Sequence, residues 1–118
     1  MDDGSVYAKA VKVADRLICA SGVETTSHRN NKNTIEKLDN RYIELFNELN
    51  PVRFKYNSGS SGRYHTGLIV DELKHAMDVA NITSQELAAY CLDDPNDEQS
   101  GGGIRYADLI AIIIAKVQ

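Results

Sequence analysis

The C-terminal segment, residues 106–118, carries apolar side chains on two faces of the helix that its pattern predicts. One face holds Tyr106, Ile110, Ile113 and Val117, and the other holds Leu109, Ile112 and Ala115. A chain of 118 residues builds one modest core, which can cover one of these faces. We therefore expect the other face to pack against further copies of the chain. β-Branched residues at both core positions favour trimers or tetramers over dimers.

Charge and composition exclude several classes of protein. The formal net charge is −4, whereas nucleic-acid binding needs a surplus of Lys and Arg gathered on one face. Cys19 and Cys91 lie far apart and form neither a zinc-ligand spacing nor a disulfide framework. The N-terminus is acidic, unlike a signal peptide, and the apolar run 109–115 is too short to span a bilayer. We expect a soluble intracellular chain with no metal, cofactor, nucleic-acid or membrane partner.

Residues 5–19 alternate in a way that predicts strands. The apolar positions are Val6, Ala8, Ala10, Val11, Val13, Leu17 and Cys19. Most of these side chains are too small to form a core of their own. Two interpretations stay open: strands of a fibre stem that pack against copies of themselves around a threefold axis, or an ordinary edge hairpin. The polar stretch 21–33 is expected to be an exposed connection.

A helix is predicted over residues 33–50. Asn33 is the expected N-cap, and Glu36 completes a capping box. Pro51 ends the helix, because proline disfavours helical geometry at the residue before it. The apolar seam consists of Ile35, Leu38, Tyr42, Leu45 and Leu49, and Ile43 and Phe46 widen it.

A strand pair and a second helix follow. The alternation in residues 52–56 predicts a strand, the loop 57–62 a turn, and residues 63–70 the return strand. Residues 71–80 predict a short amphipathic helix.

The remaining segment predicts a turn and a hairpin. Thr83 and Glu86 form a second capping box. Residues 87–92 are either the end of that turn or a strand, and we favour a strand that pairs with a partner near Ile104 and Tyr106. The acidic residues between them, Asp93, Asp94, Asp97 and Glu98, lack the spacing of a calcium loop and are expected to be a solvated hairpin tip.

Four motifs in succession resemble a known family. They are Ser27, Lys32 and Ile35; then Pro51, Val52 and Phe54; then Gly62, Arg63, His65, Gly67, Leu68, Ile69 and Glu72; and finally Tyr106. Together they resemble the endosialidase-type intramolecular chaperone domain found at the C-terminus of phage tailspikes, tail fibres and neck appendages. The resemblance covers about residues 27–118. The ordered set is much more specific than any one motif.

The resemblance implies an α+β fold, with short N-terminal stem strands, a small antiparallel sheet packed with two main helices, and an intertwined homotrimer. Residues 1–26 would be the end of the fibre stem and residues 27–118 the chaperone domain. The partners would be further copies of the chain and the upstream β stem of the same polypeptide. The domain would act in the host cytoplasm during virion assembly and then be released.

The resemblance also implies self-cleavage. A serine hydroxyl needs a nearby base, and a lysine serves when desolvation or neighbouring positive charge lowers its pKa. By resemblance, Ser27 attacks a peptide bond beside itself with Lys32 as general base, in the manner of a single-turnover serine peptidase. Holding the bond in place supplies a large effective molarity. His28, which follows Ser27 where the family usually has aspartate, is a candidate supporting residue.

Arg63, His65 and Glu72 are further candidate supporting residues. In the first interpretation their role is purely structural: His65, on a strand, forms a hydrogen bond to a neighbouring loop, and Arg63 pairs with Asp71 or Glu72. Alternatively, they line the region where the loop of Ser27 docks.

For the whole chain, two alternatives to a self-cleaving chaperone stay open: a permanent, non-cleaving trimerisation module, and a monomeric ligand-binding domain.

Overall fold

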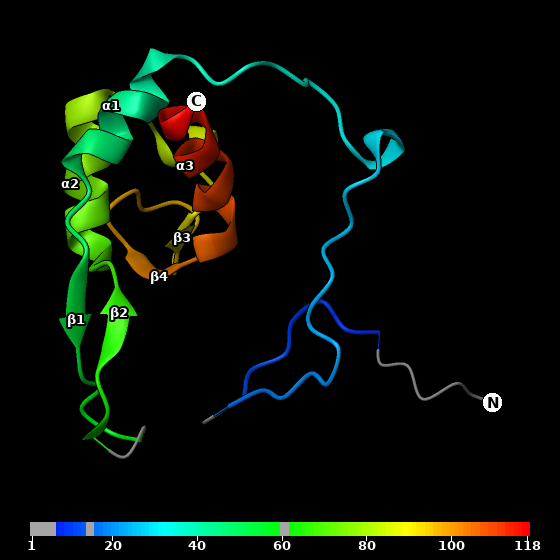
Figure 1. Cartoon of the computed structure of the whole chain (residues 1–118), viewed down its shortest axis with the longest axis vertical. Helices are drawn as coiled ribbons and strands as arrows, with labels where there is room; N and C mark the ends of the chain where they lie inside the picture. The colour runs from blue at the N-terminus through cyan, green and yellow to red at the C-terminus, as the bar shows by residue number, and fades with distance from the viewer. Residues whose placement is uncertain (1–6, 14–15, 60–61) are drawn as a thin grey trace.

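Helices α1 (Asn40–Glu48), α2 (Val70–Ala80) and α3 (Ile110–Val117) pack around the core of the chain (Figure 1). The structure, a computed structural model, describes residues 7–13, 16–59 and 62–118. Helix α1 contacts both α2 and α3. The innermost large side chains are Leu45, Leu73 and Met77, so the core lies mainly between α1 and α2.

Helix α1 begins later than the sequence predicts. Its N-cap is Asp39, whose Oδ1 accepts the N–H of Arg41 at 3.0 Å, so the capping box predicted at Asn33 is wrong. Asp39 also binds the guanidinium of Arg41 through both carboxylate oxygens, at 3.2 and 3.1 Å. These bonds favour a helix start at Asn40, because they satisfy a free N–H of the first turn and hold the first side chain in place.

The segment before α1 has no packing that would extend the helix. Ile35 and Leu38 are 56% and 42% exposed, so no buried surface offsets the entropy cost of ordering further turns. Thr34 has a φ of 51°, in the left-handed region that β-branched residues rarely adopt. The predicted seam therefore begins only at Tyr42 in the single chain.

The strands form hairpins as predicted, but in separate sheets. β1 (Val52–Phe54) pairs antiparallel with β2 (His65–Gly67), and β3 (Tyr90–Leu92) pairs antiparallel with β4 (Gly101–Ile104). In the described part of the chain the two pairs do not join. The prediction of one small sheet with two main helices is corrected accordingly, although the α+β class is confirmed. The β1–β2 hairpin points away from the helices (Figure 1).

The capping box of Thr83 and Glu86 is confirmed. It opens the 3₁₀ helix η3 (Ser84–Glu86), with the side chains and backbone of both residues bonded reciprocally. The acidic loop between β3 and β4 is tied down at Glu98, which accepts hydrogen bonds from Ser84 N and Oγ at 2.8 and 2.6 Å. These bonds hold the pKa of Glu98 below its ordinary value.

The terminal helix has the two apolar faces that its sequence predicts. A 3₁₀ turn, η4 (Tyr106–Leu109), leads into α3. Leu109 and Ile112 are buried, with 6% and 2% exposure. The opposite face is open to solvent and consists of Tyr106, Ile110, Ile113 and Val117, with Ile114 beside them. The core of one chain therefore covers one face and leaves the other uncovered.

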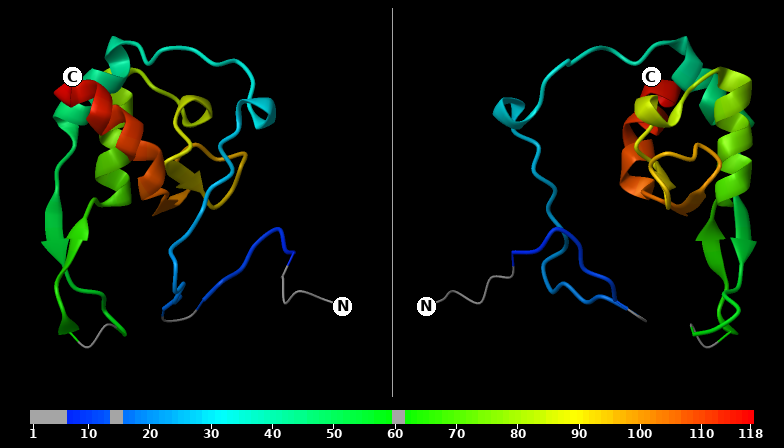
Figure 2. Two further views of the ribbon diagram at one scale, coloured as in Figure 1. Left: turned by 45° about the vertical axis from the view of Figure 1, so that its right-hand side comes forward. Right: turned by 180° about the vertical axis from the view of Figure 1, so that it is seen from behind.

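The N-terminal arm lies outside the helical core. The chain from Asp39 back to residue 16 runs away from the helices in all three views (Figures 1 and 2). Residues 7–13 and 16–26 are exposed and form no strand, so the predicted stem strands are absent there. A strand needs a neighbour for its backbone hydrogen bonds, and the single chain offers none. Residues 5, 6, 14 and 15 of that prediction lie outside the described residues.

The described residues contain neither a membrane-spanning helix nor a metal-binding cluster. None of the helices found there has the length and apolarity to cross a membrane. Within the same ranges, no group of three or more His, Cys, Asp or Glu side chains could hold a metal ion.

Candidate functional site

A short turn on the N-terminal arm brings Ser27 and Lys32 together. The 3₁₀ helix η1 (Arg29–Asn31) separates them in sequence. It reverses the chain, so that Lys32 Nζ lies 2.6 Å from Ser27 Oγ and donates a hydrogen bond to it. This is the distance that proton transfer between a nucleophile and its base requires.

The turn is held by its own hydrogen bonds. Asn31 N–H donates to the carbonyl of His28 at 2.9 Å, and Lys32 N–H donates to the carbonyl of Arg29 at 3.1 Å. His28 also caps η1, because its Nδ1 accepts the N–H of Asn30 at 3.0 Å. The predicted supporting residue His28 therefore acts on the turn and not on the hydroxyl of Ser27.

The surroundings of this pair are open. Both Ser27 and Lys32 are exposed, and η1 contacts no other helix or strand of the described chain. A lysine is a base only when uncharged, and burial favours the uncharged form. The single chain therefore provides the geometry of a serine–lysine pair without the burial that would activate it.

Arg63, His65 and Glu72 lie elsewhere, on the β1–β2 hairpin and α2. Glu72 Oε1 accepts a hydrogen bond from Asn50 Nδ2 at 2.7 Å. The ion pairs formed by the described residues do not include Arg63, so its predicted pairing with Asp71 or Glu72 is wrong. The structure does not bring these residues to Ser27.

His65 belongs to an aromatic cluster on one side of the hairpin. Its ring stacks on Phe54 with centroids 5.8 Å apart and meets Tyr56 edge-on at 4.8 Å. Its Nε2 is buried and, among the described residues, has no hydrogen-bond partner. The predicted bond from His65 to a neighbouring loop is therefore absent from the described part of the chain.

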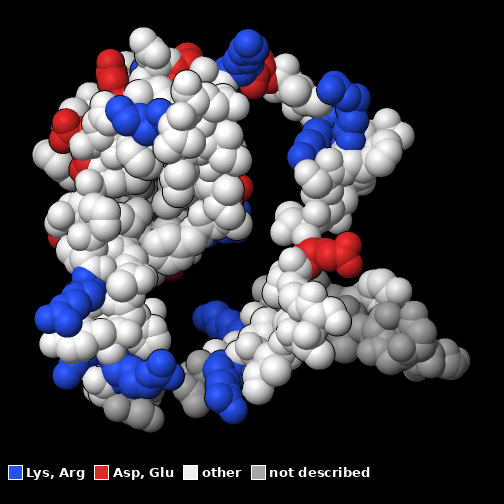
Figure 3. All heavy atoms as spheres, viewed as in Figure 1, with Lys and Arg blue, Asp and Glu red and all other residues white. Residues whose placement is uncertain are grey.

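Basic side chains occupy the other side of this hairpin. The guanidinium carbon of Arg53 lies 4.1 Å from the ring centroid of Tyr64, and Lys55 Nζ lies 4.8 Å from it. With Arg63 these residues give the hairpin three cations, and the sequence from Val52 to Val70 contains no carboxylate. Figure 3 shows Lys and Arg side chains gathered at this end of the molecule.

Arg41 forms a clamp that sequence patterns do not predict. Its guanidinium donates to Glu86 Oε2 at 2.6 Å and to the carbonyl of Asn81 at 2.9 Å, in addition to Asp39. The hydrogen bonds from Arg41 hold the pKa values of Glu86 and Asp39 below their ordinary values, and those carboxylates raise the pKa of Arg41. The clamp joins the start of α1 to the end of α2. No local sequence motif predicts this clamp, because Arg41 and Glu86 are distant in sequence.

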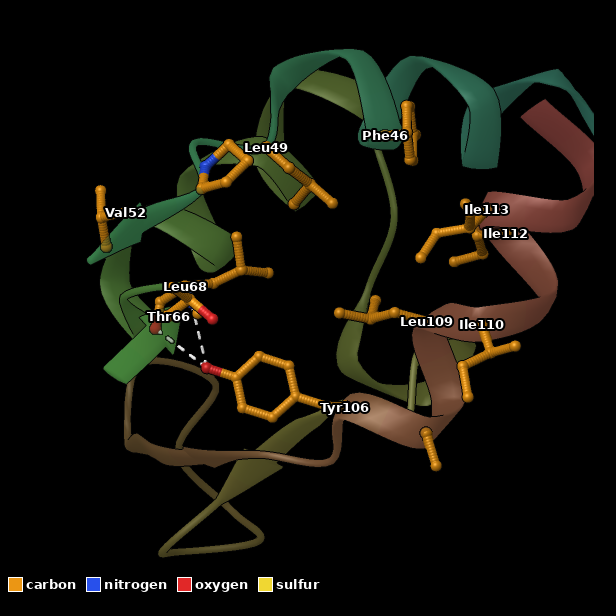
Figure 4. A pocket seen from close by; sticks show the side chains of 13 residues that line it. Phe46, Leu49, Val52, Thr66, Leu68, Tyr106, Leu109, Ile110, Ile112 and Ile113 are labelled. Atoms are coloured by element: carbon orange, nitrogen blue, oxygen red, sulfur yellow. Dashed lines mark hydrogen bonds between the residues drawn. The ribbon is translucent and has the colours of Figure 1, made fainter. Parts of the chain in front are cut away.

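An apolar groove lies between α1, the β1–β2 hairpin and α3 (Figure 4). Its volume is about 970 Å³. Its walls include Phe46, Leu49, Val52, Leu68, Ile110 and Ile113. The exposed face of α3 is thus continuous with the groove, which makes one larger apolar surface. A surface of this kind on a small domain marks a site of association.

Tyr106 closes one end of the groove (Figure 4). Its hydroxyl accepts the N–H of Leu68 at 3.0 Å and donates to the carbonyl of Leu68 at 3.2 Å. Gly67 makes room for it, since a Cβ on Gly67 would lie 2.5 Å from the hydroxyl oxygen. The lack of a side chain at Gly67 thus permits the close approach of Tyr106 to the backbone. The terminal helix is thereby fixed to the hairpin.

Comparison with known proteins agrees with this arrangement. Residues 27–82 match the model of a family described as chaperone of endosialidase. The match begins at Ser27 and includes Lys32, α1, the β1–β2 hairpin and α2. Curated proteins gave no match.

The fold has a counterpart among solved structures. It is similar to one described as the crystal structure of a novel intramolecular chaperone, with a TM-score of 0.57 and 13% identity. The similarity covers 77% of this chain and 94% of that one. At this identity the likeness concerns the fold, while the family match concerns the sequence. Taken together, the sequence match over residues 27–82 and the similar fold support an endosialidase-type chaperone domain in this chain.

Proposed function

We propose that this chain is an intramolecular chaperone that associates as a homotrimer, holds the ends of three fibre stems in register, and then separates from the stem by cutting the chain at Ser27. The parent protein would be a phage tailspike, tail fibre or neck appendage, assembled in the host cytoplasm. The single observation that carries the proposal is the pairing of Lys32 Nζ with Ser27 Oγ at 2.6 Å, at the start of the segment that matches the family.

Trimer formation is supported by the uncovered apolar surface. The exposed face of α3 and the adjoining groove contain β-branched and aromatic side chains that water cannot solvate well. Burying this face against copies of the chain would stabilise the assembly. Isoleucines at both core positions of a helix favour more than two strands.

Alignment of the stem follows from trimer formation. A stem strand made of small alternating residues specifies its register weakly. Three chains joined at one end sample fewer registers, because the entropy cost of bringing their strands together is then already met. The absence of strands in residues 7–13 and 16–26 of the single chain is consistent with this role.

The cut would proceed through an ester on Ser27. Uncharged Lys32 accepts the hydroxyl proton while Ser27 Oγ adds to the carbonyl carbon of an adjacent peptide bond. The C–N bond then breaks, the new amine leaves with the proton from Lys32, and the acyl group remains on Ser27. Water hydrolyses this ester, which frees a carboxylic acid and restores the hydroxyl. Burial of the exposed pair by the neighbouring copies would favour the uncharged lysine.

A permanent trimerisation module is the second candidate. The exposure of Ser27 and Lys32 favours it, because burial is what would favour the uncharged form that a lysine base needs. This candidate shares the trimer with the first and differs in predicting no cut.

The test is intact mass spectrometry of a stem-containing chain, with Ser27→Ala and Lys32→Ala beside the unaltered sequence. Light scattering should first give three times the 13.0 kDa mass of one chain for residues 1–118. The unaltered chain should then yield two fragments that meet beside Ser27, while both variants stay whole. If all three stay whole as folded trimers, the permanent module is correct. A monomer would overturn both candidates.

A further inference from the structure

The turn that carries the serine–lysine pair depends on one titratable side chain. η1 is three residues long and is closed by two backbone hydrogen bonds and by the bond from Asn30 N–H to His28 Nδ1. No other helix or strand of the described chain contacts it. A turn of this length in solvent is marginal by itself. The cap from His28 is therefore a large share of what keeps Lys32 close to Ser27.

This cap exists only while His28 is neutral. Nδ1 accepts a hydrogen bond through its lone pair, and protonation replaces that lone pair with an N–H. Two N–H groups would then face each other at a distance of 3.0 Å between the nitrogens. Protonation must therefore break the cap.

The charges around His28 act in the same direction. The other ionisable side chains within the turn are those of Arg29 and Lys32, and the chain carries no carboxylate between Glu24 and Glu36. A protonated His28 would place a positive charge directly beside that of Arg29, with no neighbouring carboxylate in the sequence to offset it. Repulsion between these charges would open the turn and move Lys32 from Ser27.

We propose that His28 is a positioning residue for the Ser27–Lys32 pair, and that its protonation makes the geometry of the pair pH-dependent. The inference rests on the proposed self-cleavage, whose rate it regulates. Neutral His28 holds the turn closed and permits the cut. Protonated His28 releases the turn and slows the cut, so cleavage is suppressed in a mildly acidic compartment.

The first test compares pH profiles of cleavage. The full chain is diluted from denaturant at about pH 5 to 8, and the fraction cut is followed by intact mass spectrometry. His28→Asp keeps an acceptor for Asn30 N–H that stays ionised throughout this range, whereas His28→Phe removes the acceptor. Dividing the unaltered rate by the His28→Asp rate at each pH cancels the pH dependence that the two reactions have in common, so the test concerns how this ratio changes with pH and not its absolute value.

We expect a constant ratio of the unaltered rate to the His28→Asp rate towards the upper end of the range, and a rate for His28→Phe that is lower than the unaltered rate on the order of fivefold, the usual effect of a lost cap. On acidification the unaltered chain should fall to the level of His28→Phe. His75→Gln, which changes an exposed histidine of α2, should follow the unaltered profile. A ratio that stays constant across the range would overturn the inference.

The second test does not need cleavage. In Ser27→Ala, NMR titration should show the Asn30 amide proton shifting with the same midpoint as the His28 ring, and this shift should vanish in His28→Asp. If no variant cuts at any pH, the proposed self-cleavage fails, and the Asn30 titration alone decides the role of His28. If the chemical shift of the Asn30 amide proton does not follow the titration of the His28 ring, the inference is overturned even where cleavage occurs.

Discussion

The hydroxyl of Tyr106 both accepts a hydrogen bond from the N–H of Leu68 and donates one to the carbonyl of the same residue. One side chain thus satisfies both backbone groups of a residue at the end of β2, just before α2 begins. Tyr106 lies in η4, at the start of the terminal helical segment. The relation joins the last element of the chain to the hairpin and holds the wall of the groove in place.

Tyr106→Phe should therefore destabilise the domain. The change removes both hydrogen bonds and leaves the ring, and we expect a loss of about 1 to 2 kcal/mol in the free energy of unfolding. Urea denaturation followed by circular dichroism measures this loss. Tyr64→Phe is the matched control, because that exposed tyrosine forms no hydrogen bond through its hydroxyl among the described residues. Equal stability of the two variants would contradict the prediction.

Gly67→Ala should also destabilise the domain, for a steric reason. The new Cβ would lie 2.5 Å from the hydroxyl oxygen of Tyr106 and 3.2 Å from its Cζ, so the ring must move. Thermal unfolding should show a lower midpoint than that of the unaltered chain. In a Tyr106→Ala background the same substitution should have a much smaller effect, because the clashing atoms are gone. Additive effects of the two changes would show that they do not interact.

The two faces of α3 should respond differently to substitution. Ile112→Ala removes a buried side chain and should cost about 2 to 5 kcal/mol of the free energy of unfolding. Ile113→Ser, on the exposed face, should leave the fold of one chain intact and abolish or weaken the proposed trimer. Circular dichroism and light scattering separate these outcomes. A trimer that survives Ile113→Ser together with Ile110→Ser would place the interface elsewhere.

Acid should destabilise the clamp at Arg41. The hydrogen bond from Arg41 keeps the pKa of folded Glu86 below its ordinary value of 4.5. The stabilisation from this carboxylate is fully present above that value and is lost as the pH falls towards the lower, folded pKa. Glu86→Gln should be less stable at neutral pH and should show a flatter decline below about pH 5. Denaturation midpoints measured between about pH 3 and 7 test this, and parallel declines would exclude the clamp.

Substitutions at the two candidate N-caps of α1, Asp39 in the structure and Asn33 in the sequence prediction, should have different effects on stability. Asp39→Ala should lower the thermal midpoint, because it removes the cap of α1 and one partner of Arg41. Asn33→Ala should leave the midpoint of the single chain unchanged, since Asn33 caps no helix there. A drop for Asn33→Ala in the assembled trimer alone would show that α1 lengthens on assembly.

Local patterns in the sequence predicted most of the elements. The alternation from Val52 to Tyr56, the capping box of Thr83 and Glu86, and the two faces of α3 all correspond to features of the structure. These features depend on near neighbours, whose preferences the sequence displays directly. The pairing of Ser27 with Lys32 came from the resemblance to a family, because a serine and a lysine five residues apart carry no such information by themselves.

The sequence-based predictions were wrong where contacts between residues far apart in the sequence determine the local structure. The start of α1 depends on Arg41 reaching Glu86 and Asn81, and a capping pattern at Asn33 cannot compete without packing for Ile35 and Leu38. The predicted stem strands need partners outside the single chain. The predicted pairing of Arg63 with Glu72 is not formed, and Glu72 binds Asn50, a residue 22 positions away in sequence. Sequence spacing alone reveals none of these contacts.

The isolation of η1 from the other elements determines the fate of the domain after a cut. Breaking the chain beside Ser27 removes no contact of the helices, so the released piece, which keeps Asp39 and the helices after it, should keep its melting behaviour and its apolar surface. A freed domain would then remain able to bind. Added in excess to unassembled chains, the freed domain would compete with their own chaperone domains for association. It would therefore inhibit assembly, and the inhibition would increase with its concentration.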